Sequence, residues 1–406
     1  MKVLQVVKTT EGAYWAARQA AVLARRGVIV HAVLPSQSGT TLPAWQLTGA
    51  ILHFLDCSLP ASNPPKLPSA IKKVRRLVDQ IAPDLIHSHS VTTTMMLRIA
   101  LGRNDRVPRI FQVPGPLHLE HWYTRQAELA LAGENDFWIA SSQFTRELYE
   151  QAGVPGHKLF LSYYSIDTSA RSCRRTGYLR KRLNIPPNAA IVGNINLIYP
   201  PKRFLGHTIG LKCHEDVIEA ISLVQRECKD VWGVLVGGTF GKSEAYEKKL
   251  KRLADEKGLG KILMPGKFSA DEVALSWPDF DCAVHVPLSE NCGGVVEPLL
   301  AGVPTIAGQV GGLPEVVHEG LTGKLAPIRH PDLLAKAILE VLEKRHQYKS
   351  MAERGCQLVA AMFDPERCGD EVLGIYRHIL SNDTRPSDFS SAQFLRAPQR
   401  ALAASL

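Results

Sequence analysis

The sequence predicts an α/β protein built from two Rossmann-like, doubly wound domains that face a central cleft. The chain has 406 residues, more than one ordinary core holds and enough for two domains of about 150–200 residues each. Short β-rich runs alternate with segments of helical periodicity from the N-terminus onward, and a second alternating series begins at residue 190. Apolar residues make up 45% of the chain and charged residues 21%, a composition typical of folded globular proteins.

The first alternating series occupies the N-terminal half. A strand, a turn at Gly12, a helix that stops at Gly27 and a second strand open a doubly wound sheet. Ser141 or Ser142 can cap the last helix of this series. We expect strands at 3–7, 28–34, 85–89, 109–113, 137–140 and 159–163, and helices at 13–26, 70–81, 92–101 and 142–151.

The second series follows a basic segment, 171–182, which we interpret as the interdomain linker. Strands are expected at 190–195, 231–237, 262–265, 282–286 and 304–307, and helices at 214–227, 243–256, 270–277, 295–301, 331–343 and 350–362. The predicted domains are 1–185 and 186–365, both Rossmann-like, with a helix at 366–380 that packs back on the first domain. We expect the Ser/Pro/Ala-rich tail, 381–406, to be mobile.

Charge and cysteine content limit the class of protein. A formal net charge of +9 and a pI of about 9.1 favour an anionic partner, which includes a sugar nucleotide, a phospholipid surface or nucleic acid. The eight cysteines form no CxxC pair and no zinc-ligand spacing, so we expect reduced thiols. No signal peptide and no run of about 20 apolar residues is apparent. We therefore expect a cytoplasmic protein, with peripheral contact at the inner face of the membrane as an alternative.

Residues 279–317 carry most of the functional information. They read DFDCAVHVPLSENCGGVVEPLLAGVPTIAGQVGGLPEVV. The Gly293–Gly294 turn lets backbone N–H groups approach a phosphate closely, and a helix that starts near Val295 directs its positive end at that phosphate. Glu297, in the first turn of this helix, can accept hydrogen bonds from both hydroxyls of a ribose. The pattern therefore predicts a nucleotide-phosphate site.

The same segment resembles the C-terminal signature of the retaining glycosyltransferase family 4, which has the GT-B fold. The resemblance rests on Pro287, Glu290, the Gly–Gly turn, Glu297 and a Gly-x-Pro turn at 302–304. It implies transfer of a hexosyl group from a nucleoside-diphosphate sugar to an acceptor hydroxyl, in polysaccharide or glycolipid synthesis. It also implies UDP or GDP in preference to ADP, no cofactor, no metal, and a sugar or lipid-linked sugar as acceptor.

One departure from the family pattern concerns the first glutamate. The family usually has one residue more between its two glutamates than separates Glu290 from Glu297, and Ser289 stands at the usual distance. Either the loop is shorter by one residue or Ser289 replaces the acid. We favour the shorter loop, with Glu290 reaching the hydroxyls of the donor sugar.

The resemblance implies roles for further residues. In the family, a histidine follows a strand of the first domain, and a lysine follows the first strand of the second domain and clamps the diphosphate. His118 occupies the histidine position, with His121 as an alternative, and Lys212 occupies the lysine position. The residues that recognise the base are expected at Lys267–Phe268. The implied catalytic residues are Glu290, His118 and Lys212, and the implied donor contacts are Gly12, Lys202, Arg203, Lys212, Gly237, Gly293, Gly294, Val295 and Glu297.

Several other patterns are interpreted as structural. His87 and His89 end a strand, and we expect them to satisfy neighbouring groups, since no third zinc ligand is near in sequence. Asp279 and Asp281 have the DxD spacing of another glycosyltransferase fold but precede an apolar strand, so we do not assign them a metal.

Three other functions were considered. A sugar-nucleotide epimerase of the same two-domain shape remains an alternative. A further alternative is a basic, non-enzymatic binder of a membrane surface or nucleic acid, although no RNA-binding signature is present. The helix at 70–81, with four basic residues, is the candidate membrane contact. A dinucleotide-dependent oxidoreductase is disfavoured because no GxGxxG follows the first strand.

Overall fold

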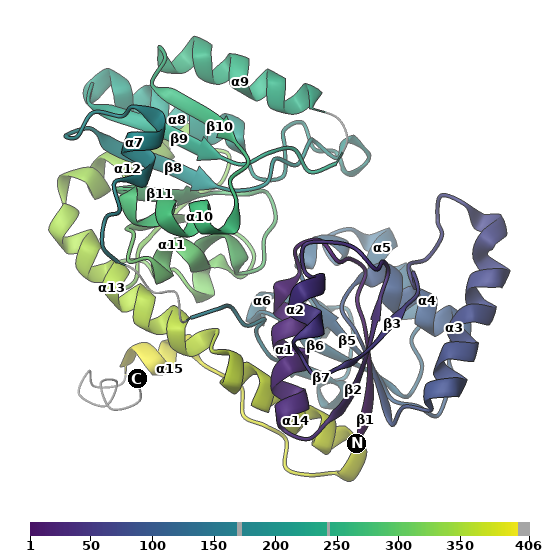
Figure 1. The fold of residues 1–406 in the computed structure, drawn as a ribbon. Coiled ribbons are helices and arrows are strands. Elements are labelled where there is room, and N and C mark those ends of the chain that lie inside the picture. The colour runs from purple at the N-terminus through teal and green to yellow at the C-terminus, as the bar shows by residue number, and fades with distance from the viewer. Residues whose placement is uncertain (169–172, 242–243, 397–406) are drawn as a thin grey trace. The chain divides into compact units, whose positions relative to one another are not determined.

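A computed structural model describes residues 1–168, 173–241 and 244–396 of the chain. The chain divides into two compact units (Figure 1). The first unit contains residues 1–168 and returns at 362–390, and the second contains the described residues between them together with 391–396. Residues 173–185, which we had assigned to the first domain, therefore belong to the second unit.

The first unit is built on one parallel sheet of seven strands, in the order β3-β2-β1-β4-β5-β6-β7. Its strand order reverses direction between β1 and β4, which is the topological switch point of a Rossmann fold. Buried apolar residues alternate between the two faces: Val3 packs with one core cluster and Leu4 with another. The strands are β1 (Lys2–Val6), β2 (Ile29–Leu34), β3 (Ile51–Phe54), β4 (Leu85–Ser88), β5 (Arg109–Val113), β6 (Asp136–Ala140) and β7 (Leu159–Leu161).

Helices cover both faces of this sheet. On one face α1 (Tyr14–Arg25) packs against α14 (Pro365–Ser381), and on the other α3 (Leu67–Ile81) packs against α4 (Val91–Leu101). The first unit also contains α2 (Leu42–Gln46), α5 (Trp122–Ala130) and α6 (Gln143–Gln151). The cap of α6 is Ser142, whose hydroxyl accepts a hydrogen bond from the Thr145 N–H at 3.1 Å.

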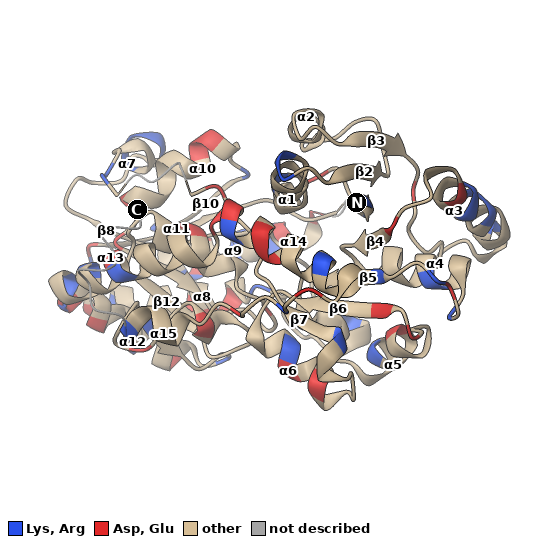
Figure 2. Ribbon diagram, turned by 90° about the horizontal axis from the view of Figure 1, so that it is seen from below, with Lys and Arg blue, Asp and Glu red and all other residues tan. Residues whose placement is uncertain are grey.

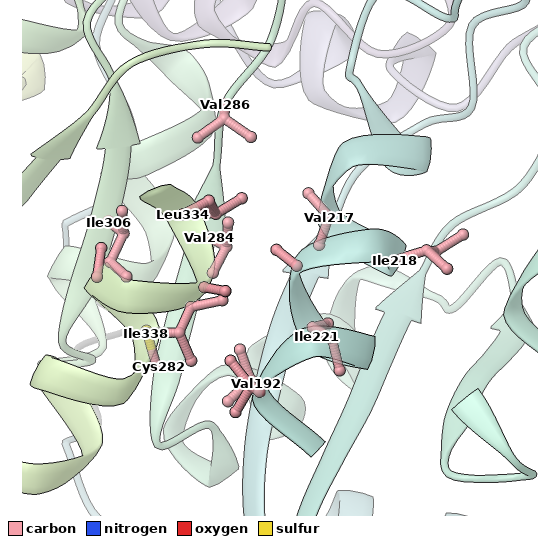
Figure 3. Packing of buried hydrophobic residues seen from close by; sticks show 14 of the residues in the cluster. Val192, Val217, Ile218, Ile221, Cys282, Val284, Val286, Ile306, Leu334 and Ile338 are labelled. Atoms are coloured by element: carbon pink, nitrogen blue, oxygen red, sulfur yellow. The ribbon is translucent and has the colours of Figure 1, made fainter. Parts of the chain in front are cut away.

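The second unit has a parallel sheet of six strands, in the order β10-β9-β8-β11-β12-β13. Figure 3 shows side chains of its core, in which Val192 and Val284 of the sheet lie among residues of two helices, such as Ile221 and Ile338. The strands are β8 (Ala190–Ile195), β9 (Val231–Val236), β10 (Ile262–Gly266), β11 (Cys282–His285), β12 (Thr305–Gly308) and β13 (Lys324–Ala326). The helices are α7 (Tyr178–Leu183), α8 (His214–Glu227), α9 (Ala245–Gly258), α10 (Ala270–Ser276), α11 (Val296–Leu300), α12 (Pro331–Glu343), α13 (Arg345–Met362) and α15 (Ser391–Arg396).

Most expected elements occur within a few residues of their predicted bounds. The elements that the sequence did not predict are short and lack a clear period, namely α2, β3, α5, α7, β13 and α15. Of these, α7 lies within the supposed linker and is held by tertiary contacts: the Asp279 carboxylate accepts hydrogen bonds from the N–H groups of Gly177 and Leu179, both at 2.8 Å. Position 243, the expected start of a helix, lies outside the described residues.

The helix expected at 366–380 is α14, and it lies in the first unit with residues of the N-terminal segment. Arg26 on the first helix forms a bidentate hydrogen bond with Asp370, at 2.7 and 2.9 Å. Part of the expected tail, 381–390, also belongs to this unit, since Arg146 pairs with Asp388. In the described part of the chain, no helix is both long and apolar enough to span a bilayer.

Candidate functional site

A charged cluster lies at the carboxyl edge of the second sheet, where loops follow β8 and β11. Lys212 ends the long loop after β8, and its ammonium pairs with the Glu290 carboxylate. The ring of His285, the last residue of β11, donates from Nε2 to Glu290 Oε2 at 3.0 Å. Asn196 Nδ2 lies 3.3 Å from the other ring nitrogen of His285, Nδ1. A lysine, a carboxylate, an imidazole and an amide thus form one connected network.

Burial and charge set the ionisation of this cluster. The side chains of Lys212 and Glu290 are each 15% exposed. Burial opposes ionisation of Glu290, but the neighbouring Lys212 charge and the hydrogen bond from His285 hold its pKa well below the ordinary value. Burial lowers the pKa of His285, so the imidazole is neutral at pH 7 and donates through one nitrogen only. The network contains one cation and one anion at neutral pH.

Two glycines allow this cluster to pack closely. A Cβ on Gly294 would lie 2.0 Å from His285 Nε2, so no other residue leaves room for the ring. Gly311 adopts a positive φ of 59°, and a Cβ there would lie 1.8 Å from the carbonyl oxygen of Glu290. Gly293 differs, since a Cβ there would meet nothing within 4 Å. Gly294 and Gly311 therefore hold the positions of His285 and Glu290.

Glu297 lies on the exposed side of α11, and Val295 and Val296 separate it from the Gly–Gly turn. Its carboxylate accepts a hydrogen bond from the Trp277 indole N–H at 3.1 Å. The helix expected at 295–301 is shorter than predicted: residues Gly293–Val295 form a 3₁₀ turn, and α11 has only five residues. A helix this short carries little macrodipole, so any phosphate contact here must come mainly from individual N–H groups of the turn.

Ser289 and Glu290 differ in their surroundings. Ser289 is buried, whereas Glu290 provides the carboxylate that meets Lys212 and His285. The side chain that contacts Lys212 is therefore the carboxylate of Glu290. Glu290 stands one residue from the position that the first glutamate usually has in the family.

Other expected donor contacts of the second unit have different settings. Gly237, at φ 151°, lies against β8, since a Cβ would come 1.8 Å from the carbonyl oxygen of Asn196. Arg203 belongs to a 3₁₀ turn, Arg203–Leu205, and lines a separate open pocket with Lys249. Phe268 is a core residue, while Lys267 is exposed. The structure thus brings Lys212 and Glu290 together and places Arg203 in another hollow of the same unit.

Gly12 and His118 belong to the first unit. Gly12, at φ 74°, begins the turn before α1, and its N–H donates to the Thr40 hydroxyl at 3.3 Å. His118 Nε2 lies 3.1 Å from the Tyr149 hydroxyl, which in turn donates to Glu128 at 3.3 Å. Burial lowers the pKa of His118 to about 4. Its ring is thus tied to a buried network, while the alternative, His121, stands half-buried just before α5.

That buried network continues through four charged side chains. Glu128 pairs with Arg98, whose Nε also donates to Asp136 at 3.0 Å, and Asp136 pairs in turn with Arg109 at 2.6 Å. Each of these four side chains is at most 4% exposed. Paired and hydrogen-bonded charges of this kind fix the geometry of the elements that carry them. The His118 ring is positioned by this network.

The remaining sequence candidates have structural partners. His87 and His89 are fully buried, and their Nδ1 atoms face the hydroxyls of Tyr376 and Tyr164. Asp281 accepts a hydrogen bond from the Ile191 N–H at 2.8 Å, just as Asp279 binds the backbone of α7. Within residues 1–168, 173–241 and 244–396, no three His, Cys, Asp or Glu side chains gather in an arrangement that could hold a metal ion.

Two family descriptions match the chain, one on each half. Residues 12–163 match the glycosyl transferase 4-like domain, and residues 203–357 match glycosyl transferases group 1. The chain belongs to the family 4 glycosyltransferases of GT-B fold. The fold and family inferred from residues 279–317 are thereby confirmed.

One curated protein and two solved structures resemble this chain, and the solved structures share its fold. D-inositol 3-phosphate glycosyltransferase of Corynebacterium urealyticum is 27% identical over 210 residues, which are 51% of this chain and 47% of that protein. The alignment thus spans less than half of that curated relative. The crystal structure of Anabaena HepE in complex with UDP and glucose superposes with a TM-score of 0.76, at 20% identity, over 93% of this chain and 99% of that one. A putative UDP-N-acetylglucosamine 2-epimerase from Listeria monocytogenes gives 0.64 at 16% identity, over 96% and 99%.

Sequence reasoning missed His285 in this glycosyltransferase. The residue ends a buried apolar strand two positions before Pro287, where a histidine has no packing advantage. His285 is a polar residue at the end of an otherwise apolar strand, a few residues before the Gly–Gly turn. Such a buried polar residue is uncommon and indicates a functional role. Asn196 carries the same signal at the end of β8.

Proposed function

We propose that this glycosyltransferase moves a hexosyl group from a nucleoside-diphosphate sugar to an acceptor hydroxyl with retention of configuration and without a metal. The observation that carries the proposal is the Lys212–Glu290–His285 network beside the Gly293–Gly294 turn. Lys212 would stabilise the departing diphosphate as a point charge, and the N–H groups of the turn would bind its oxygens. Glu290 would accept hydrogen bonds from the sugar hydroxyls, and Glu297 from the ribose.

The proposed reaction breaks one bond, forms one bond and moves one proton. The bond between the anomeric carbon and the diphosphate oxygen breaks, and the acceptor oxygen bonds to the same face of the sugar. The acceptor proton passes to the leaving diphosphate, so no side chain needs to act as a covalent nucleophile. The contribution of the protein is positioning and charge stabilisation.

UDP sugars are the first donors to test. A structural neighbour, HepE, was crystallised with UDP and glucose, which makes UDP the first nucleotide to try. A thermal-shift screen of UDP, GDP and ADP sugars would rank them, because a ligand bound only by the folded state raises the midpoint.

Glu297 provides the decisive variant. We expect Glu297→Ala to reduce transfer by about 100-fold or more while the circular dichroism spectrum stays unchanged, since loss of one aligned polar contact costs about 2.7 kcal/mol or more in the transition state. Glu343→Ala, an exposed glutamate on α12, is the matched control. Full turnover by the Glu297 variant would contradict this role.

An epimerase of the same fold is the alternative activity. An epimerase would convert the donor in the absence of any acceptor, whereas a transferase releases nucleoside diphosphate only when the acceptor is present. Analysing the donor by NMR after incubation without acceptor separates the two, and an epimer would overturn the transferase proposal.

We also propose that the acceptor is presented at an anionic membrane surface, as expected for glycolipid or lipid-linked polysaccharide synthesis. Basic positions along α3 are coloured blue in Figure 2, and Lys72, Lys73 and Arg76 are exposed. Arg75 is also exposed, and its Nε donates to the carbonyl of Ala100. Co-sedimentation with vesicles containing anionic lipid, lost on Lys72→Glu with Lys73→Glu, would support it. Equal sedimentation of that variant would contradict it.

A further inference from the structure

The second unit contains an open pocket away from the Lys212–Glu290 network. It lies between the loop after β8 and the first turns of α9, and its volume is about 730 Å³. Pockets of about 300–1,000 Å³ hold small organic ligands. The lining residues are Pro200, Pro201, Arg203, Gly206, His207, Thr208, Ala245, Tyr246 and Lys249.

The lining is cationic. Arg203 and Lys249 bring two permanent positive charges, and no Asp or Glu belongs to the lining. In the described part of the chain, no carboxylate lies within 4.0 Å of the Arg203 guanidinium. Lys249 is 64% exposed, and its only ion-pair neighbour there is Glu215, at 4.0 Å. The charge of Arg203 is therefore uncompensated, and an anion in the pocket would gain attraction without displacing an existing partner.

The pocket is preformed by hydrogen bonds that do not involve its cations. The Tyr246 hydroxyl accepts from the Gly210 N–H at 2.7 Å and donates to Glu215 at 2.6 Å, which fixes the end of the loop to α9. At the other end, the Phe240 N–H donates to the carbonyl of Ile198 at 2.9 Å. Because Glu215 is held by Tyr246, it is not free to turn toward Arg203.

The backbone adds to the attraction for an anion. Ala245, the first residue of the 14-residue helix α9, lines the pocket. The first N–H groups of a helix lack carbonyl partners within it and carry a partial positive charge. A hydroxyl from Thr208 completes a set of guanidinium, ammonium and hydroxyl donors, which is the set that binds phosphate oxygens.

We propose that this pocket binds the phosphate group of a small phosphate ester, such as a sugar phosphate, as a second anion site separate from the donor diphosphate site. The difference in charge between the two places supports the separation. Lys212 is neutralised by Glu290 in the resting protein, whereas Arg203 faces its pocket unpaired. An acceptor phosphate ester and free phosphate share this chemistry, and the experiment distinguishes the two sources.

Binding is measured by isothermal titration calorimetry on the full chain with glucose 6-phosphate, inorganic phosphate and glucose as probes. We expect glucose 6-phosphate to bind with a Kd of about 1 mM or tighter. Inorganic phosphate should bind more weakly and glucose should not bind. Tighter binding of the ester than of phosphate indicates a sugar-phosphate ligand, and equal binding indicates free phosphate. Binding of glucose as tight as that of its phosphate, or no binding of either anion, would overturn the proposal.

Variants separate this pocket from the donor site. We expect Arg203→Ala and Lys249→Glu each to weaken glucose 6-phosphate by at least tenfold, and Lys212→Ala to weaken UDP but not glucose 6-phosphate. Lys248→Glu, one residue along the same helix and outside the pocket, is the matched control. The proposal fails if Lys248→Glu weakens glucose 6-phosphate as much as Lys249→Glu does, or if UDP displaces glucose 6-phosphate from the wild-type protein. Since UDP binding is measured separately, its absence would count against the proposed donor and not against this pocket.

Discussion

Gly294 carries no side chain because the imidazole of His285 occupies the space where a Cβ would be. A Cβ placed 2.0 Å from Nε2 would push the ring away from Glu290 Oε2, which it now meets at 3.0 Å. The neighbouring Gly293 has open space around its missing Cβ. Packing therefore requires a glycine at 294 but not at 293, a difference that the Gly–Gly motif in the sequence does not reveal.

Replacing these two glycines tests the difference. We expect Gly294→Ala to lower the free energy of unfolding by about 1–3 kcal/mol, because overpacking a filled site forces its neighbours to move. Gly293→Ala should change it by less than about 1 kcal/mol. Urea denaturation followed by circular dichroism measures both, and equal effects would contradict the assigned packing.

The Lys212–Glu290 pair makes a second residue-scale prediction. Removing one partner leaves a nearly buried charge uncompensated, so Lys212→Ala should cost about 3–5 kcal/mol of stability. Glu290→Gln in the same chain removes that charge and should restore at least part of the loss. A double-mutant cycle on unfolding free energies measures the coupling. If the two effects simply add, the pair is not interacting in the folded protein.

At the scale of elements, α14 completes a core that the first 168 residues do not complete alone. Val372, Ile375 and Tyr376 of this helix are buried in the same cluster as residues of β1 and α1. Its Tyr376 hydroxyl meets His87, and its Glu371 accepts a hydrogen bond from the Ser162 hydroxyl at 2.9 Å. Residues 362–390 are therefore part of the first unit.

Tyr376→Phe tests how tightly this helix is bound. We expect a loss of about 1–3 kcal/mol, since His87 Nδ1 would be buried without its partner. Tyr348→Phe, a tyrosine of α13 whose hydroxyl meets the partly exposed Glu340, should lose less. Thermal unfolding of the two variants provides the comparison, and a larger loss for Tyr348→Phe would contradict it.

At the scale of the whole molecule, buried neutral histidines predict a loss of stability in mild acid. Burial lowers the pKa of His89 to about 3 and that of His214 to about 4, compared with an ordinary value of 6.5. The unfolded chain therefore binds more protons than the folded one between those limits. Stability falls as the pH falls from about 6.5 to about 3, by up to about 1.4 kcal/mol per pH unit for each such group.

A single substitution isolates one contribution to this slope. His89→Gln should flatten the dependence of unfolding free energy on pH between 6 and 4 by about 1.4 kcal/mol per unit, whatever its effect at pH 7. His157→Gln, at an exposed position, is the matched control. Urea denaturation at several pH values across this range measures the slope. If the unfolding free energy of His89→Gln and that of the wild-type protein vary in parallel with pH, the imidazole is not buried in its neutral form.

The sequence by itself determined the alternation of strands and helices, the two Rossmann-like sheets and the family signature around Glu290 and Glu297. Period, turn residues and motif spacing are local properties, and residues close in sequence express them. Long elements such as α8, expected at 214–227 and observed there, were the most predictable for this reason.

Only the tertiary structure decided which polar groups meet. Lys212 and Glu290 are 78 positions apart, and although the family resemblance assigned both to the donor site, neither segment predicts that their side chains pair. The short helix α7 was read as a linker because Asp279, about a hundred positions away, supplies the acceptor for its N–H groups. Contacts of this length depend on how strands order themselves in a sheet, and that order minimises exposed apolar surface over the whole unit, not over any window of sequence.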